Sequence, residues 1–192
     1  MTLESKIIGG LERLSEVFKT LLWEKAKVHG LSPIQIQILL FVRKHSVELC
    51  SVSHLAKEFN LTKATISDAV KVLINKNLLE KDFTPADNRR YNLLITRQGE
   101  NLTQDLLDYS EAISKALSYL DDREHSTLYQ VLTKLIYRLN QLGVIQVQRT
   151  CFNCRYYNGN KTTHHFCNLL EKPLATTDIQ LDCPEFEEFR AA

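Results

Sequence analysis

The stretch that decides the fold is residues 51–75, SVSHLAKEFNLTKATISDAVKVLIN. Ser51 and Thr62 each precede a short run of helix-forming residues, and such residues are favoured N-caps because their hydroxyls accept a free backbone N–H. Only Asn60 and Leu61 separate the first predicted helix, which ends near Phe59, from the second, which ends near Asn75. This spacing predicts a helix-turn-helix.

The second of these helices has two different faces. Its apolar stripe consists of Ile66, Ala69, Val70, Leu73 and Ile74. The opposite face carries Ala64, Asp68, Lys71 and Asn75, with Thr65 and Ser67 on the flanks. These short or polar side chains leave room for a groove of nucleic acid.

A β-hairpin is predicted directly after this helix. Residues 78–83 and 91–95 are rich in branched and aromatic side chains, as strands are, and residues 84–90 between them have turn chemistry. Arg89 and Arg90 give the hairpin a positively charged tip.

Helices are predicted on both sides of this region. Upstream, a long amphipathic helix stops at Gly30, and Ser32 with Gln35 forms a capping box for a second helix that runs to about Lys44. A few residues of strand are expected around residues 49–50. Downstream, Thr96 caps a helix predicted to run to about Leu120.

The last predicted helix begins at residues 121–122 and ends at Gly143. Its leucines at positions 128, 132, 135, 139 and 142 keep roughly heptad spacing. Because the chain offers no large partner for these terminal helices, self-association into a homodimer is expected.

The charge is unevenly distributed, although the formal net charge is only +1. Residues 62–97 hold seven basic side chains (Lys63, Lys71, Lys76, Lys81, Arg89, Arg90, Arg97) against four acidic ones. Such a patch suits contact with phosphates, and an ordinary solvated surface has the same composition. Charge alone therefore leaves both readings open.

The order of elements resembles that of the MarR family of bacterial transcriptional regulators. Asp87-Asn88-Arg89 followed by Ile95-Thr96 and Gly99 is similar to the family's D-x-R and L-T-x-x-G pattern, and residues 52–67 resemble its paired helices. About residues 5–145 are covered. The resemblance implies a homodimer that lays residues 62–75 in the major groove of double-stranded DNA and the hairpin, or wing, along the minor groove.

This resemblance also assigns roles to individual residues. It implies that Arg89 enters the minor groove and that Asp87 orients it. The DNA-binding residues expected are Thr62, Lys63, Ala64, Thr65, Ser67, Asp68, Lys71, Asp87, Arg89 and Arg90. Asp68 departs from the basic or neutral residue of many members, so it either reads a cytosine amino group or is held by Lys71.

Four cysteines lie beyond the region of resemblance: Cys151, Cys154, Cys167 and Cys183. Their number in a short, acidic, cytosolic segment predicts one metal centre, with zinc favoured because four thiolates form a closed tetrahedral set. An iron–sulfur cluster is the alternative. Pro184 after Cys183 is typical of the last ligand of ferredoxin-type motifs, although those motifs usually have three closely spaced cysteines and this tail has only two. Paired or free thiols remain a third option, and His164 or His165 could replace one cysteine.

These observations predict a mainly α chain with two parts. Residues 1–148 form a winged helix-turn-helix (α+β) core inside a helical dimerisation domain, and residues 149–192 form a small cysteine-rich, metal-stabilised tail. The expected function is a cytoplasmic, non-membrane, non-enzymatic regulator that occupies an operator and responds to metal, redox state or a small-molecule effector. The competing hypothesis is a winged-helix and zinc-tail protein-interaction module without sequence-specific DNA binding.

Overall fold

The computed structural model describes residues 1–84 and 87–188, and leaves the side chains of residues 84 and 87–90 undescribed. The chain forms two compact units, Met1–Lys115 and Ala116–Ala192. The boundary between the two units reflects which residues pack together. The boundary predicted at residues 148/149 instead marked where the cysteine-rich segment begins. Each unit is described by itself.

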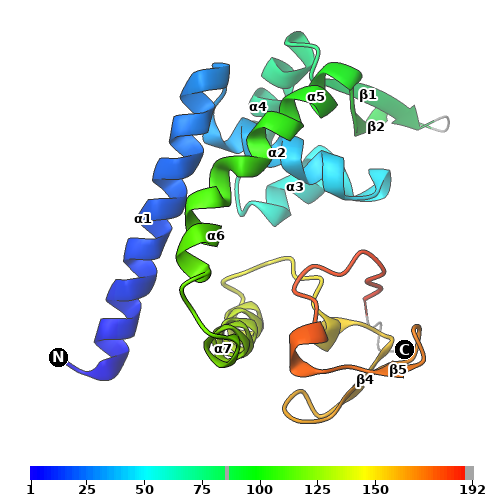
Figure 1. Cartoon of the computed structure of the whole chain (residues 1–192). Coiled ribbons are helices and arrows are strands. Elements are labelled where there is room, and N and C mark those ends of the chain that lie inside the picture. Colours follow the sequence, from blue (N-terminus) through cyan, green and yellow to red (C-terminus); the bar gives the residue numbers. More distant parts are fainter. Residues whose placement is uncertain (85–86, 189–192) are drawn as a thin grey trace. The chain divides into compact units, whose positions relative to one another are not determined.

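The N-terminal unit contains the predicted helix-turn-helix and hairpin (Figure 1). Its helices are α1 (Leu3–His29), α2 (Pro33–Lys44), η1 (Val47–Leu49), α3 (Val52–Glu58), α4 (Lys63–Asn75), α5 (Arg97–Leu106) and η2 (Leu107–Ser110), with α6 (Glu111–Leu117) across the boundary. The strands β1 (Leu79–Thr84) and β2 (Asp87–Ile95) form an antiparallel hairpin. The predicted winged-helix class is therefore confirmed.

Two local predictions are wrong. Residues 47–49 form a single 3-10 turn and not a strand, although Cys50 accepts one hydrogen bond from the Leu93 N–H at 3.0 Å. The helix predicted from Thr96 to about Leu120 is interrupted by η2. There Lys25 of α1 pairs with Asp108 at 2.7 Å, and Leu106 is buried while Leu107 is exposed. Contacts with α1 favour this tighter turn over a continuous α-helix.

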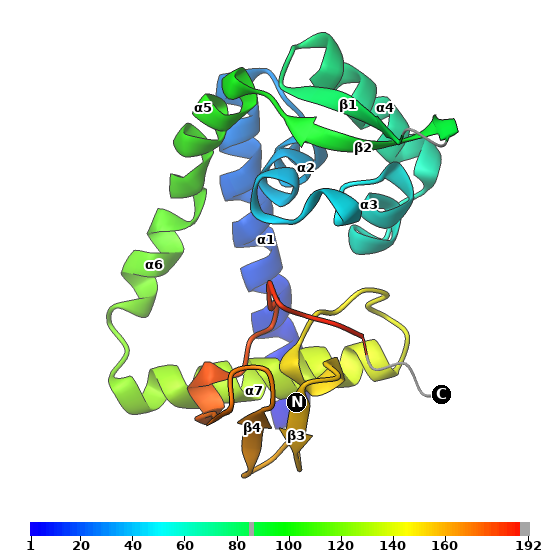
Figure 2. The ribbon, with the colours of Figure 1, turned by 90° about the vertical axis from the view of Figure 1, so that its right-hand side faces the viewer.

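One apolar core holds the winged helix together. It includes Ile36, Leu39, Leu55, Ile66, Leu73 and Leu93, drawn from α2, α3, α4 and β2. Figure 2 shows the hairpin beside α4, with α2 and α3 packed below them. Burying the apolar stripe of α4 in this core leaves its other face toward solvent.

The start of α5 lies very close to the chain that leads into the hairpin. A Cβ atom at Gly99 would stand 2.2 Å from the Leu78 carbonyl oxygen and 2.8 Å from Ile95 Cγ1, so only glycine fits. Thr96 caps α5 by accepting the Gly99 N–H at 3.0 Å, and its hydroxyl donates to the Asn77 carbonyl at 2.7 Å. This joint fixes the base of the hairpin.

The second unit consists of one long helix and an irregular tail. Helix α7 (Asp122–Gln141) begins with a capping box between Asp121 and Glu124. The tail has η3 (Cys151–Asn153), η4 (Thr176–Asp178) and a sheet of three short strands, β3 (Tyr157–Gly159), β4 (His165–Cys167) and β5 (Lys172–Pro173). Across residues 1–84 and 87–188, no helix is both long and apolar enough to cross a membrane.

Candidate functional site

Helix α4 is positioned as a recognition helix by its N-terminal turn. Asn60 adopts a left-handed φ of 52°, and the Leu61 N–H bonds the Ala56 carbonyl at 2.9 Å, which turns the chain sharply between α3 and α4. Thr62 then accepts the Thr65 N–H at 3.1 Å. The helix therefore starts with a fixed cap at an exposed end.

Seven of the ten side chains that the sequence assigned to DNA binding lie on this helix or at its N-cap. Thr62, Lys63, Ala64, Thr65, Asp68 and Lys71 are exposed, and Ser67 is half-buried. The exposed set follows one face, because Ile66, Ala69, Val70 and Leu73 are buried on the other. An outer face of small and polar groups can approach a groove closely.

Asp68 and Lys71 form an ion pair on this face. The lysine Nζ lies 2.9 Å from Asp68 Oδ1, and both side chains are largely exposed. The hydrogen bond from Lys71, followed by the carboxylate charge, raises the pKa of this lysine above its ordinary value. The structure therefore shows the pairing with Lys71 that was considered for Asp68, and its contact with a cytosine amino group stays a prediction.

The hairpin contributes a second, aromatic and basic surface. Phe83 and Tyr91 stand opposite each other in the register, with ring centroids 5.9 Å apart, and Phe83 is 50% exposed. Lys81 lies over the Tyr91 ring at 4.4 Å from its centroid. The sequence analysis missed this cluster; the alternation of residues 81, 83 and 91 on one face of the hairpin could have indicated it.

The predicted wing residues Asp87, Arg89 and Arg90 lie on β2, but their side chains fall outside the described part of the structure. The backbone places them next to residues 85–86, at the end of the hairpin away from Gly99.

The four tail cysteines gather in the second unit. Cys151 begins η3 and Cys154 follows it, and the Cys154 N–H donates to the Cys151 carbonyl at 3.0 Å. Cys183 is brought near by the pairing of its own segment with residues 149–151: its N–H bonds the Arg149 carbonyl at 2.9 Å, and Cys151 N–H bonds Gln180 at 3.1 Å. Cys167 on β4 stands opposite Tyr157 on β3.

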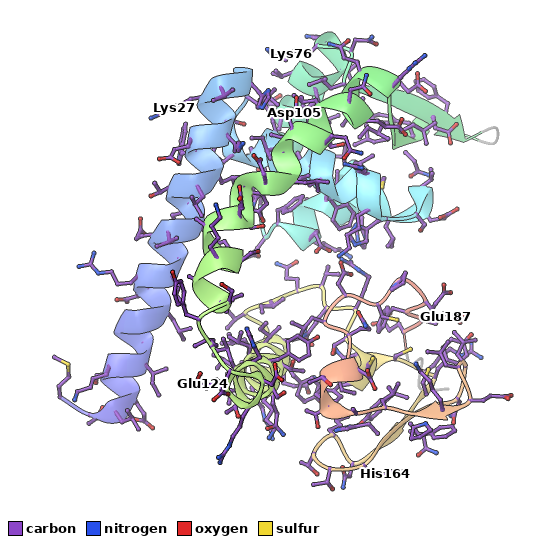
Figure 3. All side chains as sticks on the ribbon, in the orientation of Figure 1. Lys27, Lys76, Asp105, Glu124, His164 and Glu187 are labelled. Carbon is purple, nitrogen blue, oxygen red and sulfur yellow. The ribbon has the colours of Figure 1, made fainter. Side chains whose placement is uncertain are left out.

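A further set of contacts joins Cys154 to the C-terminal segment. Cys154 forms a bridge with Glu188, and Glu187 accepts hydrogen bonds from Arg155 at 2.8 Å and from Tyr156 at 2.6 Å. Figure 3 labels Glu187 on this segment and His164 in the loop before β4. The hydrogen bond from Tyr156 and the charge of Arg155 lower the pKa of Glu187.

The result is one cavity lined by all four of these cysteines. Its volume is about 50 Å³, and Tyr156, Tyr157, Leu169, Leu170 and Glu185 complete the lining. All four thiols are free. Even so, within residues 1–84 and 87–188 no three histidine, cysteine, aspartate or glutamate side chains are placed to hold a single metal ion.

His165 does not line the cysteine cavity and instead contacts Tyr157. It is 4% exposed, and its Nδ1 lies 2.6 Å from the Tyr157 hydroxyl. Burial, followed by the charges of His164 and Lys134, lowers the pKa of His165. Neither histidine is among the residues that line the cysteine cavity.

Comparison with known proteins agrees with the geometry of the first unit. The winged-helix fold, together with the matches to the MarR family and to a transcriptional repressor, supports a DNA-binding transcriptional regulator. Residues 29–90 match the MarR family, and the chain is 25% identical over 134 residues to the HTH-type transcriptional repressor MdtR of Bacillus subtilis (strain 168), covering 69% of this chain and 85% of that protein.

Solved structures show the same fold. The MepR–DNA complex of S. aureus is similar with a TM-score of 0.61 and 21% identity, covering 72% of this chain and 99% of that one. A MarR/EmrR family regulator of Acinetobacter sp. ADP1 has a TM-score of 0.60 and 22% identity, covering 73% and 99%. More than a quarter of this chain therefore lies outside each alignment. Proteins of this class act by binding DNA, which agrees with the expectation that the chain is not an enzyme.

Proposed function

We propose that this chain regulates transcription as a homodimer that occupies an operator, with α4 of each copy in the major groove and the hairpin beside it. The observation that carries the proposal is the exposed face of α4, which presents the predicted contact residues from Thr62 to Lys71 on a helix whose other side is fixed in the core. The MepR structure, which contains DNA, has the same fold.

The electrostatics of α4 suit phosphate contact. An exposed ion pair contributes about 0–1 kcal/mol to stability, so Lys71 can leave Asp68 for a phosphate at little cost. Arg89 supplies the proposed minor-groove contact, where a narrow groove concentrates negative potential. Lys81 and Tyr91 would lie along the DNA backbone, between the phosphate contact of Lys71 and the minor-groove contact of Arg89.

The exposed apolar face of α1 is the proposed dimer interface. Its apolar side chains Leu3, Ile7, Leu14 and Phe18 are exposed in the single chain, whereas Ala26 and Leu22 further along the helix pack in the core. Figures 1 and 2 show the first turns of α1 projecting beyond the other helices of this unit. A second copy would cover this face, and two recognition helices would then meet half-sites roughly 34–36 Å apart.

The DNA-binding mode can be tested with a matched pair of lysines. Lys71→Ala removes a cation paired with an acid three residues earlier on α4, and Lys19→Ala removes the equivalent cation paired with Glu16 on α1. Binding to one fixed DNA duplex is measured by fluorescence anisotropy over a series of salt concentrations. Lys71→Ala should reduce the slope of log affinity against log salt by about 1 for each copy that contacts a phosphate.

Lys19→Ala should leave this slope unchanged. Arg89→Ala should cost roughly 1–3 kcal/mol on an operator selected from a random duplex pool. If Lys71→Ala and Lys19→Ala bind alike, α4 does not face DNA. If the parent protein shows no salt-dependent affinity for duplex, the interaction-module hypothesis replaces this one.

The tail is proposed to hold a metal centre through Cys151, Cys154, Cys167 and Cys183, as the sequence predicted. The convergence of these four residues on one cavity supports the proposal. Zinc was the favoured occupant on ligand chemistry alone. The effector that controls operator binding stays a prediction.

A further inference from the structure

We propose that the four cysteines of the tail hold an iron–sulfur cluster and not a single zinc ion. This inference rests on the proposed metal centre of the tail and adds the identity of its occupant. It is carried by three features of the second unit: the size of the cavity, the placement of the sulfurs, and the apolar groups around them.

The cavity that the cysteines line, together with two tyrosines, two leucines and Glu185, has room for more than one ion. Zinc–sulfur bonds of about 2.3 Å put the four sulfurs within about 4 Å of one another, with no free space between them. A cavity needs only roughly 10–15 Å³ to hold a water molecule. The space that the cysteines line is about 50 Å³, which suits an occupant of several atoms.

The placement of the cysteines agrees with this reading. A single zinc ion requires all four sulfurs to converge on one point, and no three such side chains do so in the described ranges 1–84 and 87–188. In iron–sulfur clusters with four cysteine ligands, the ligands are shared among the irons, so each iron binds only one or two of them. Cysteines that surround a common cavity without meeting at one point have this arrangement.

The surroundings of the sulfurs also fit a cluster. Cys151 Sγ accepts the Gln180 N–H at 3.2 Å, and Cys183 accepts a backbone hydrogen bond from Glu185. Backbone N–H groups directed at thiolates and an apolar surround are the features that tune such clusters. Leu169 and Leu170 line the cavity and are exposed in the chain alone, so a bulky occupant would give them contacts.

The tail also needs a cross-link for its stability. Its buried apolar core consists of Cys151, Phe152 and Ile179, supported by Tyr137, Tyr157 and Leu174. The strands span only two or three residues each. So small a core does not offset the conformational entropy of about 40 ordered residues, whereas ligand bonds that join three distant segments do.

The test is the composition of the full-length protein, purified without air and then reconstituted with ferrous iron and sulfide, with equimolar zinc present as a competitor. Iron, acid-labile sulfide and zinc are measured per chain after desalting, together with the visible absorption spectrum. At least about two irons and two sulfides per chain, with a brown colour, are expected.

Variants then assign the ligands. Cys154→Ser and Cys183→Ser should each lose most of the iron and sulfide. Cys50→Ala is the matched control, because Cys50 is buried in the other unit with its Sγ 3.3 Å from the Ser46 carbonyl, and it should keep both. If a ligand variant is insoluble, the iron, sulfide and zinc content of the parent and of Cys50→Ala still distinguishes a cluster from a zinc site.

Two outcomes would overturn the inference in different ways. One zinc per chain with little sulfide would leave the metal centre in place but make it a zinc site. Four reactive thiols with neither metal would remove the centre itself. Neither outcome bears on DNA binding, which is measured separately by the salt dependence of duplex affinity.

Discussion

Replacing Gly99 by alanine should destabilise the winged helix through one close contact. The added Cβ would stand 2.2 Å from the Leu78 carbonyl oxygen and 2.8 Å from Ile95 Cγ1. Ordinary carbon contacts begin near 3.5 Å, so the chain must open by about 1 Å at this joint. The first partner is backbone, which cannot rotate away as a flexible side chain would.

The cost follows from two effects. Overpacking a fixed site costs about 1–3 kcal/mol. Opening the joint also strains the cap, in which Thr96 bonds both Gly99 and Asn77, and losing a cap costs about 1 kcal/mol. Together they predict a loss of roughly 2–4 kcal/mol in the free energy of unfolding, or on the order of 10 °C in the melting temperature of this unit.

The matched control is the same substitution at Gly10. Its added Cβ would meet nothing within 4 Å, and the residue lies inside α1. Alanine there should gain about 0.5–1 kcal/mol, because it favours the helix over the unfolded chain. Both variants are followed by urea unfolding with circular dichroism, and by duplex affinity, which only Gly99→Ala should weaken. A Gly99→Ala protein as stable as the parent would refute the argument.

Three further predictions address other parts of the chain. Burial, and then the charge of Glu48, raise the pKa of Cys50 to about 11, so the unfolded chain releases this proton first. Stability should therefore fall between about pH 8.5 and 11, and this fall should be smaller in Cys50→Ala when urea midpoints are compared. Leu14→Glu with Phe18→Glu on α1 should give a monomeric mass by light scattering, and an unchanged dimer would show that this face is not the interface. Tyr129→Phe removes a hydrogen bond to the Ile179 carbonyl and should cost about 1 kcal/mol in the second unit alone, so loss of winged-helix stability would contradict the separation of the units.

Local signals in the sequence predicted the ends of most helices. The capping box of Ser32 and Gln35, the caps at Ser51, Thr62 and Thr96, and the start at Asp121 are all confirmed. These features could be predicted because a cap depends on side chains within three residues of the helix end. The outer face of α4 followed from the same periodicity.

Features that depend on tertiary contacts could not be read in this way. Leu102, Leu106, Ile113 and Leu117 keep helical spacing through the break at η2, so the pattern hides it. The break accompanies the pairing of Asp108 with Lys25, 83 residues away. The cysteines were identified as a set from the sequence, but the cavity between them depends on backbone pairing between residues 149–151 and 180–183.

The ion pair on α4 links the stability of the free protein to its choice of DNA. If Lys71 turns to a phosphate as proposed, Asp68 would be left as an acid facing the major groove, where neighbouring phosphates would repel it. Among the base edges of that groove, the cytosine amino group is the donor from which a carboxylate commonly accepts a hydrogen bond. Guanine and thymine offer the carboxylate no donor at their major-groove edges, and the adenine amino group stands beside the N7 acceptor, which would repel it. In the proposed complex, Asp68 would therefore oppose binding at most sequences, and it would favour a site with a cytosine amino group because other bases would bind less well.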